Sequence, residues 1–331
     1  MLNTKERYPA IDYLKFLAVI LVMNSHLNDY YTKYQMLATG GAMGDALFFF
    51  ASGFTLLLGR RMSFDNWYKR RINRIYPSIL AAAIFAFLIF RFREDFIDVL
   101  IGKRYWFISC ILLYYVLIYP IKYFGEGKYL KHVFIGWSVI CIIVYFTIFG
   151  ANVTYYGDWT FRIFVFFLFM LQGAYMGIHQ KDYHYKKLYP IYWILSIIAW
   201  VILSKIGTGK WYHITSVIPL LLFSRYSYLI FTSDKFTNFY RTKIGGNIIY
   251  IISQLCLEVY LIQKFAFTDK INFLFPLNIP INMVLALIAA YMVKLLANLI
   301  QQTFRTEPYD WKNMLLYKKK DMIIVPTSST K

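Results

Sequence analysis

Two ionisable residues lie eleven positions apart in the first hydrophobic segment of the chain, Lys15 and His26. Eleven steps of about 100° return to within roughly 20° of the starting direction, so in a helix both side chains lie on one face, about 16 Å apart along the axis. A cation and a titratable base then share one stripe. Ionisable groups in such a segment are costly to bury and are functional candidates, so this stripe, with His26 as the candidate base, is the strongest lead to a chemical function.

The same segment also has a simpler interpretation. Asp12 precedes Lys15 by three residues, and the two would form an i,i+3 ion pair near one membrane interface. His26 would then lie at the opposite headgroup boundary, where other histidines of the chain also fall. Hydrogen-bonding side chains near it, Asn24 and Ser25 among them, favour the chemical interpretation because they would fix one tautomer of the imidazole.

A second candidate lies in the next hydrophobic segment, where residues 44–54 run from Gly-Asp-Ala through three phenylalanines to Ala-Ser-Gly-Phe. The small pair Ser52 and Gly53 permits the backbone of another helix to approach closely. The same small side chains would equally let a slender ligand pass. Both interpretations stay open.

A third candidate is the basic run that precedes Pro77 and contains Arg70, Arg71 and Arg74 at helical spacing. Proline suits the first turn of a helix, so we expect a membrane span to begin at Pro77. Charge runs of this kind commonly mark the cytoplasmic side. The functional alternative is phosphate binding, for which the planar guanidinium fork is well suited.

A fourth candidate is Glu258, near the middle of a segment that is otherwise largely apolar. A carboxylate in this place must face protein or water. The structural interpretation pairs it with a cation on another helix, for example Arg162 or Arg225. The functional interpretation makes it part of a site.

The composition determines which elements position these residues. With 59% hydrophobic, 21% aromatic and only 16% charged residues, the chain lies well outside the soluble average of about 25% charged. This is typical of an integral membrane protein. We expect a bundle of about ten transmembrane helices, because the segments cross roughly 30 Å of hydrocarbon and lack the alternation of a barrel. The expected spans are 10–27, 40–59, 77–92, 105–121, 132–150, 160–178, 189–206, 212–231, 247–267 and 281–303.

Lysines and arginines indicate the orientation of the bundle. Loops on the side of the N-terminus hold far more of them than loops on the opposite side, so the positive-inside rule places both termini in the cytoplasm. The formal net charge of +19 is spread over every cytoplasmic loop. This pattern favours contact with anionic membrane lipids and argues against binding of nucleic acid.

No linker, long polar insert or sequence repeat divides the chain. We therefore expect one membrane domain over 1–304 and a short basic cytoplasmic tail over 305–331. The three cysteines fall in apolar runs without CxxC spacing, so they are expected to be core residues and no metal site is expected. Because the first segment carries Asp12 and Lys15 and lacks a clear cleavage site, we expect it to be a retained helix.

Taken in order, these segments resemble the membrane-bound acyltransferase-3 family, bacterial ten-helix proteins that O-acylate cell-surface glycans and similar acceptors. Asp12, Lys15 and His26 keep the spacing of the family's Asp-x-x-Arg followed by His. Residues 48–54 are similar to its Phe-Phe-x-x-Ser-Gly-Phe segment, and residues 70–77 are similar to its Arg-x-x-Arg-Ile-x-Pro loop.

Two later stretches carry weaker likeness, Trp106-Phe107-Ile108 and the four residues that begin at Glu258. The chain also departs from the family pattern at two positions. Lys15 replaces the usual arginine, which keeps the charge and loses the bidentate fork. Gln263 stands where many members have a second histidine, so a mechanism with two histidines is in doubt here, whereas the candidate base remains.

The resemblance implies an enzyme of the bacterial inner membrane that moves an acyl group, most simply from acetyl-CoA, to a glycan or a lipid-linked saccharide. It implies His26 as general base, with direct transfer and an acyl-histidine step both open. The residues expected in the catalytic site are His26, Lys15 and Glu258. Those expected to hold the phosphates of the donor are Arg70, Arg71, Arg74 and Lys15. Those expected near the acceptor or the oxyanion are Asp12, Asn24, Ser52, Tyr76 and Trp106.

Three other functions compete with this hypothesis. A transporter or flippase for a glycan or other anionic substrate would also place charged groups inside ten spans, although the duplicated halves typical of transporters are missing from the sequence. A glycan polymerase is expected to have a large outer loop, and every outer loop expected here is short. A structural or sensory protein would tolerate substitution at His26 and Glu258.

Overall fold

The computed structural model describes residues 7–59, 61–92, 98, 105–125, 127–151, 153–303 and 307–317. The regular elements of the described chain are helices, which confirms the all-α class. The α-helices are α1 Pro9–Ser25, α2 Gly41–Leu56, α3 Phe64–Phe90, α5 Trp106–Gly125, α6 Leu130–Thr147, α7 Trp159–Ile178, α8 Tyr189–Ile206, α9 Val217–Phe231, α10 Asp234–Arg241, α11 Lys243–Gln254, α12 Cys256–Ala266 and α13 Asn278–Thr303. Short 3-10 helices are η1 Asn28–Tyr30, η2 Gln35–Leu37, η3 Gln180–Asp182, η4 Trp211–Ser216, η5 Asn272–Leu274 and η6 Trp311–Asn313.

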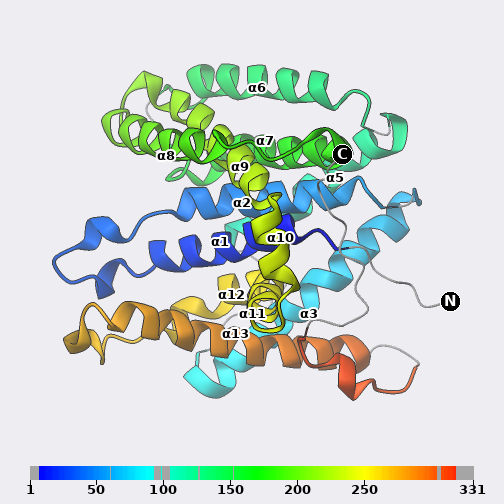
Figure 1. Cartoon of the computed structure of the whole chain (residues 1–331), viewed down its shortest axis with the longest axis vertical. Coiled ribbons are helices and arrows are strands. Elements are labelled where there is room, and N and C mark those ends of the chain that lie inside the picture. Colours follow the sequence, from blue (N-terminus) through cyan, green and yellow to red (C-terminus); the bar gives the residue numbers. More distant parts are fainter. Residues whose placement is uncertain are drawn as a thin grey trace.

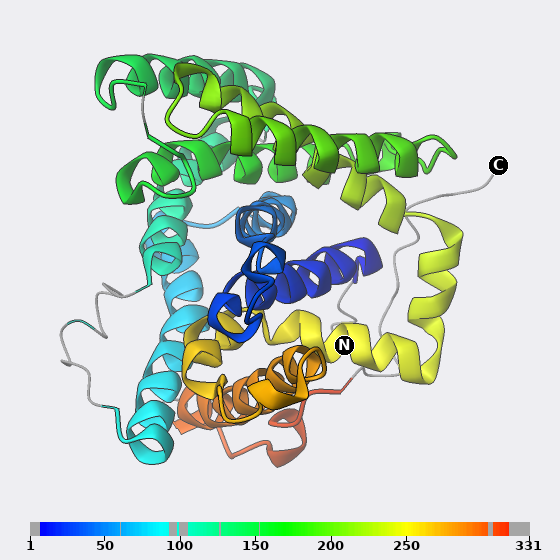
Figure 2. The ribbon, with the colours of Figure 1, turned by 90° about the vertical axis from the view of Figure 1, so that its left-hand side faces the viewer.

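Helices α1 and α2 occupy the centre of the bundle (Figures 1 and 2). One side is covered by α6, α7, α8 and α9, and the other by α3, α11, α12 and α13. The outer helices α6 and α8 are only 17% buried over their apolar windows, as expected for helices that face lipid. The apolar side chains of α1 and α2 are mostly buried instead, so the first two helices form the core on which the rest of the bundle packs.

Seven helical segments of the described chain are long and apolar enough to cross a membrane, and the bent pair α11 and α12 makes up to eight. The other two expected spans correspond to α1 and α2, which are shorter, at 17 and 16 residues. The structure therefore supports a multi-pass membrane protein. The count of ten and the cytoplasmic placement of both termini stay predictions, and much of the tail over 305–331 lies outside the described residues.

The third span begins earlier than expected. Helix α3 starts at Phe64, so Pro77 lies inside the helix and the prediction that it opens the span is wrong. Proline has no N–H to give to the carbonyl four residues earlier, which is that of Asn73. The side-chain amide of Gln301 on α13 donates to that carbonyl at 3.0 Å. A neighbouring helix thus satisfies the freed group, which is how proline is tolerated within a membrane helix.

The ninth span is broken rather than continuous. The expected helix over 247–267 is divided at Leu255 into α11 and α12, which meet at a bend of 77°. Neither proline nor glycine occurs in this stretch, so no breaker marks the bend in the sequence. The Sγ of Cys256, at the start of α12, lies 3.6 Å from the backbone carbonyl of Lys15, and the break therefore lies against the middle of α1.

The small pair in the second helix serves close packing. A Cβ atom added to Gly53 would overlap the backbone carbonyl of Met170 on α7, and one added to Gly173 on α7 would overlap the carbonyl of Phe50 on α2. The two backbones are therefore in direct contact, as expected for small residues at membrane helix interfaces. This supports the packing interpretation of Ser52 and Gly53.

Candidate active site at the two ends of helix α1

The imidazole of His26 closes the C-terminal end of α1. Its Nδ1 lies 2.8 Å from the backbone carbonyl of Val22, one turn earlier. A carbonyl oxygen only accepts hydrogen bonds, so in the neutral ring Nδ1 carries the proton and Nε2 carries the lone pair. The end of the helix thus selects the tautomer that leaves Nε2 available as a base. Among the described residues no hydrogen bond to Nε2 is found.

Gln263 on α12 holds the imidazole from another side. Its Nε2 lies 3.4 Å from Nδ1 of His26, while its Oε1 is buried without a hydrogen-bond partner in the described chain. A half-turn of the amide would point Oε1 at the Nδ1–H group, so that its proton would be shared between the Val22 carbonyl and Oε1. Gln263 therefore orients His26 and lies at the position where a second histidine would contact it.

His26 and Gln263 line a cavity of about 240 Å³ together with Tyr105, Trp106 and Arg162. The guanidinium carbon of Arg162, on α7, lies 4.5 Å from the centre of the Trp106 ring, a cation–π contact. An Nη2 group of Arg162 also donates to the carbonyl of Tyr156. The cavity therefore brings one base and two cations, Arg162 and Lys264, together within aromatic walls.

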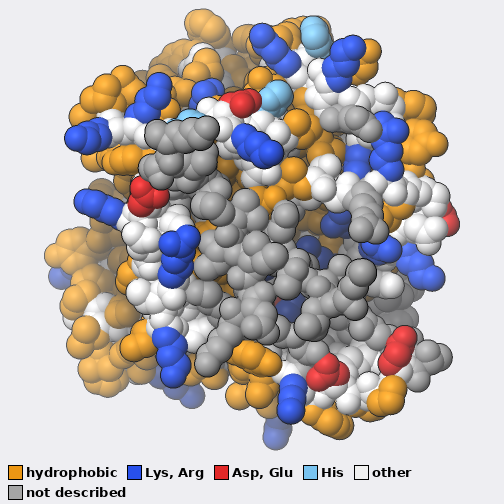
Figure 3. Space-filling model, turned by 45° about the vertical axis from the view of Figure 1, so that its right-hand side comes forward, with side chains coloured by type: hydrophobic (Ala, Val, Ile, Leu, Met, Phe, Trp, Pro, Cys, Tyr) orange, Lys and Arg blue, Asp and Glu red, His pale blue; other side chains and the backbone are white. Residues whose placement is uncertain are grey.

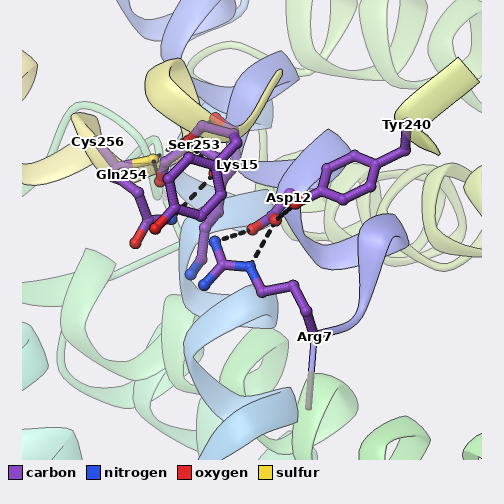
Figure 4. A network of polar contacts seen from close by, with 8 residues as sticks. Arg7, Asp12, Lys15, Tyr240, Ser253, Gln254 and Cys256 are labelled. Carbon is purple, nitrogen blue, oxygen red and sulfur yellow. Dashed lines mark hydrogen bonds and ion pairs between the residues drawn. The ribbon is translucent and has the colours of Figure 1, made fainter. Parts of the chain in front are cut away.

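The opposite end of α1 carries a closed ion pair. The guanidinium of Arg7 donates to both carboxylate oxygens of Asp12, at 2.7 Å and 2.6 Å, and the hydroxyl of Tyr240 donates to the same carboxylate at 2.6 Å (Figure 4). Burial and the charge of Asp12 raise the pKa of Tyr240, so its hydroxyl keeps the proton that it donates. Asp12 is fully engaged by Arg7 and Tyr240. The alternative ion pair with Lys15 is therefore not formed.

Lys15 lies beside other cations. It is half-buried on α1, near enough to Arg74 and Arg7 for their charges to interact, and Figure 4 shows its ammonium and the Arg7 guanidinium directed into the same region. Arg71 is held by aromatic rings, 5.1 Å from that of Trp67 and 5.7 Å from that of Tyr115.

The described residues supply no ion pair for this group of cations, which comprises Lys15, Arg70, Arg71 and Arg74. Figure 3 views the molecule with this end turned forward, and lysine and arginine side chains are spread over that face. Like charges raise one another's energy unless an anion offsets them. The basic end is therefore suited to a polyanionic group such as a chain of phosphates.

Glu258 lies between the two ends. Its side chain is completely buried, accepts a hydrogen bond from Ser78 at 2.6 Å and pairs with Lys294 of α13 at 2.8 Å. The expected structural partners, Arg162 and Arg225, are both wrong. This ion pair joins α12, α3 and α13, and its geometry supports a structural role rather than contact with substrate.

Of the five residues expected near the acceptor or the oxyanion, Trp106 lines the cavity of His26 and the other four do not. Asp12 lies at the opposite end of α1, bound to Arg7. The amide of Asn24 donates to the carbonyls of Leu37 and Thr39 at 2.8 Å and 2.9 Å and accepts from Tyr31 at 2.6 Å, so it holds the loop between α1 and α2. Ser52 is eleven residues, about 16 Å, along α2 from the end that contacts α1 near His26. Tyr76 lies on α3 next to the arginines of the basic end.

Arg162 and Asp45 are the functional candidates that the sequence patterns did not single out. Arg162 appeared only as a partner for Glu258, and Asp45 only as a member of the run 44–54. Each is a charged residue near the end of an apolar segment, and this is the sequence feature that could have identified it. Their relation to His26 depends on how α2 and α7 pack.

Comparison with known protein families identifies the family of the chain. The family model described as an acyltransferase domain matches residues 8–299 of the 331, a range that includes both ends of α1 and the ion pair between them. No curated protein and no solved structure matches the chain. The match covers most of the sequence and agrees with the resemblance carried by its motifs. The chain belongs to the acyltransferase 3 family and is a multi-pass membrane acyltransferase.

Proposed function

We propose that the protein transfers an acetyl group from acetyl-CoA to a hydroxyl of a cell-surface glycan or its lipid-linked precursor, in the inner membrane of a bacterium. One observation carries this proposal. His26 keeps Nε2 available beside a cavity at one end of α1, while cations without acidic partners in the described chain gather at the other end. A base and a group of cations that suits phosphate thus lie at opposite ends of one helix.

The donor is expected to bind along α1. Its phosphates contact Lys15, Arg70, Arg71 and Arg74, and its long, thin pantetheine arm carries the thioester toward His26. Lys15 lies within α1 and His26 caps its C-terminal end, eleven positions or about 16 Å further along, so neither residue serves both ends of the ligand. An elongated donor therefore fits the long distance between Lys15 and His26.

The transfer step follows from the tautomer of His26. As the acceptor oxygen attacks the thioester carbon, Nε2 takes the hydroxyl proton, a role worth about 10²- to 10⁴-fold in rate. The tetrahedral intermediate collapses by breaking the carbon–sulfur bond, and the proton on Nε2 passes to the departing sulfur of coenzyme A. Arg162 and Lys264 both line this cavity, and Arg162, which is held against the Trp106 ring, is the cation that stabilises the oxyanion.

The test uses the purified full-length protein in lipid nanodiscs with radiolabelled acetyl-CoA and a set of bacterial glycans. Wild-type protein is expected to label a glycan, and His26→Ala to lose labelling while it elutes as a folded species. His184→Ala, which changes an exposed histidine between α7 and α8, serves as the matched control and should label normally. Full transfer by folded His26→Ala would refute the assigned role.

The broken pair α11 and α12 favours a second candidate, a transporter or flippase, because discontinuous helices line the pathways of many transporters. Uptake or flipping of the glycan by proteoliposomes that contain no coenzyme A separates the two functions. Movement of substrate without the donor would support transport, whereas labelling that depends on acetyl-CoA supports the acyltransferase.

A further inference from the structure

A second cavity of about 350 Å³ adjoins the one that contains His26. Ser25 lines this second cavity and His26 lines the first, and the side chain of Arg162 borders both. The two cavities therefore lie next to each other at the C-terminal end of α1, with Arg162 between them. A volume of this size lies within the range of roughly 300–1,000 Å³ that small-molecule sites occupy.

Asp45 is the acidic residue of this second cavity. It follows Gly44, where an added Cβ atom would lie 2.5 Å from Val22 and 2.9 Å from the carbonyl of Ala18. The missing side chain lets α2 press against α1 and fixes the carboxylate beside the end of that helix.

The carboxylate of Asp45 has no hydrogen bond and no ion pair to any residue that the structure describes, although Arg162 is near enough for their charges to interact. A half-buried carboxylate is costly without hydrogen-bond donors. Intramembrane acids of this kind are functional candidates. Donors from a ligand would satisfy it.

The other residues that line the cavity indicate which kind of ligand it binds. Aromatic rings of Tyr156, Phe166 and Trp200 form the wall, and the indole N–H of Trp200 is already donated to Tyr155 at 2.7 Å, so the ring presents an apolar surface. Two cations, Arg162 and Lys205, accompany the one carboxylate.

A neutral, hydroxyl-rich molecule suits this lining of mixed charge, because it can give hydrogen-bond donors to Asp45. An acidic group next to Asp45 would be repelled by the carboxylate, and an ammonium group would be repelled by the two cations. A hydroxyl both donates and accepts, so adjacent hydroxyls of one sugar ring can donate to Asp45 and accept from Arg162 while the ring lies against the aromatic wall.

We propose that the 350 Å³ cavity binds a neutral sugar ring of the acceptor, with Asp45 accepting hydrogen bonds from its hydroxyls, and thereby presents a neighbouring hydroxyl to His26. The inference rests on the proposed function for the identity of the acceptor. Asp45 is a specificity-determining residue in this assignment and does not take part in the proton transfer.

The experiment measures binding without coenzyme A, so that it is independent of catalysis. Full-length protein in nanodiscs is titrated by calorimetry with three sets of oligosaccharides of equal length, composed of neutral hexoses and N-acetylhexosamines, of uronic acids, or of amino sugars. We expect a neutral oligosaccharide to bind best. Asp45→Asn should weaken it about 10- to 100-fold, because hydrogen bonds to a charged acceptor are lost, while the KM for acetyl-CoA stays unchanged.

Asp29→Asn is the matched control, since it removes the same charge from an exposed position in the loop after α1. It should bind the neutral oligosaccharide like the wild type. Asp45→Glu keeps the charge and should retain more affinity than Asp45→Asn, which separates a binding defect from misfolding. Preference for the acidic or amino sugars, failure of every neutral sugar to bind, or equal affinity of Asp45→Asn and Asp29→Asn would overturn the assignment. Sugar binding without any acetyl transfer would refute the proposed reaction alone.

Discussion

The two ends of α1 differ in which of their charged groups have a partner of opposite charge. At the basic end the acid is satisfied, because Asp12 binds Arg7 and Tyr240, and cations remain without acidic partners in the described chain. At the end of His26 it is the acid Asp45 that lacks a partner among described residues, while Arg162 stacks on Trp106. A protein leaves buried charge unpaired at a cost, so each end is prepared for a different ligand, one anionic and one rich in hydroxyls.

Removing the base should give the largest effect and should separate the two ends kinetically. His26→Gln is expected to lower kcat by about 10²- to 10⁴-fold with little change in the KM for acetyl-CoA, because proton transfer is lost and donor binding is not. Lys15→Met should do the reverse and raise that KM about ten-fold. Steady-state kinetics of both variants checks the division, and a common defect in kcat and KM for both would contradict it.

Breaking the ion pair between the ends should reduce stability rather than chemistry. Glu258→Gln leaves the partly exposed ammonium of Lys294 without its carboxylate, which costs less than the roughly 3–5 kcal/mol of a fully buried pair. The double variant Glu258→Gln with Lys294→Met should recover much of this loss and should transfer acetyl groups. Unfolding in mixed detergent micelles, followed by circular dichroism, measures the stability. A stable but inactive double variant would instead place Glu258 in the catalytic site.

The pH dependence of kcat should arise from His26 and not from the basic end of α1. An imidazole in water titrates near pH 6.5, and the protonated ring has no lone pair on Nε2. Below its pKa, the kcat of the wild type should fall about ten-fold for each pH unit, and above it kcat should level off. The kcat of Lys15→Met should depend on pH as that of the wild type does, whereas the residual kcat of His26→Gln should lose this dependence. A profile that moves with Lys15 would show that the ends are coupled.

Restoring the guanidinium fork at the basic end should have the smallest effect. Lys15→Arg keeps the charge and adds a planar group that binds phosphate with two hydrogen bonds. We expect the KM for acetyl-CoA to fall by a few-fold and kcat to stay the same. Dephospho-CoA as an inhibitor provides the control, since any gain that depends on the removed phosphate should disappear with it. A change in kcat without a change in KM would be unexpected.

The sequence predicted much of the fold because it depends on local features. Apolar length alone located most helices within a few residues, as α7 and α8 show. The failures have tertiary causes. The interior position of Pro77 is tolerated because Gln301 on another helix satisfies the carbonyl of Asn73, and the bend at Leu255 lies where α12 meets α1. Neither contact can be recognised from the residues around Pro77 or Leu255, because the contacting helix is distant in the sequence.

The candidate site was only partly predictable for the same reason. The spacing of Lys15 and His26 depends on one helix, so the sequence gives their common face and their separation. The tautomer of His26 depends on a carbonyl of that same helix, at Val22, and follows once the helix is known to end there. The neighbours at Gln263 and Arg162 come from α12 and α7, and their approach is a property of packing.

By itself, the sequence determined that this chain is a helical membrane protein with a base and a cation on one stripe, because hydrophobic length and helical periodicity are local. Only the tertiary structure decided which charges are neutralised. Asp12 binds Arg7 instead of Lys15, Glu258 binds Lys294, and Asp45 is left facing a cavity. The energy of a charge depends on every group within a few ångströms in any direction, and that neighbourhood is fixed only when distant helices come together.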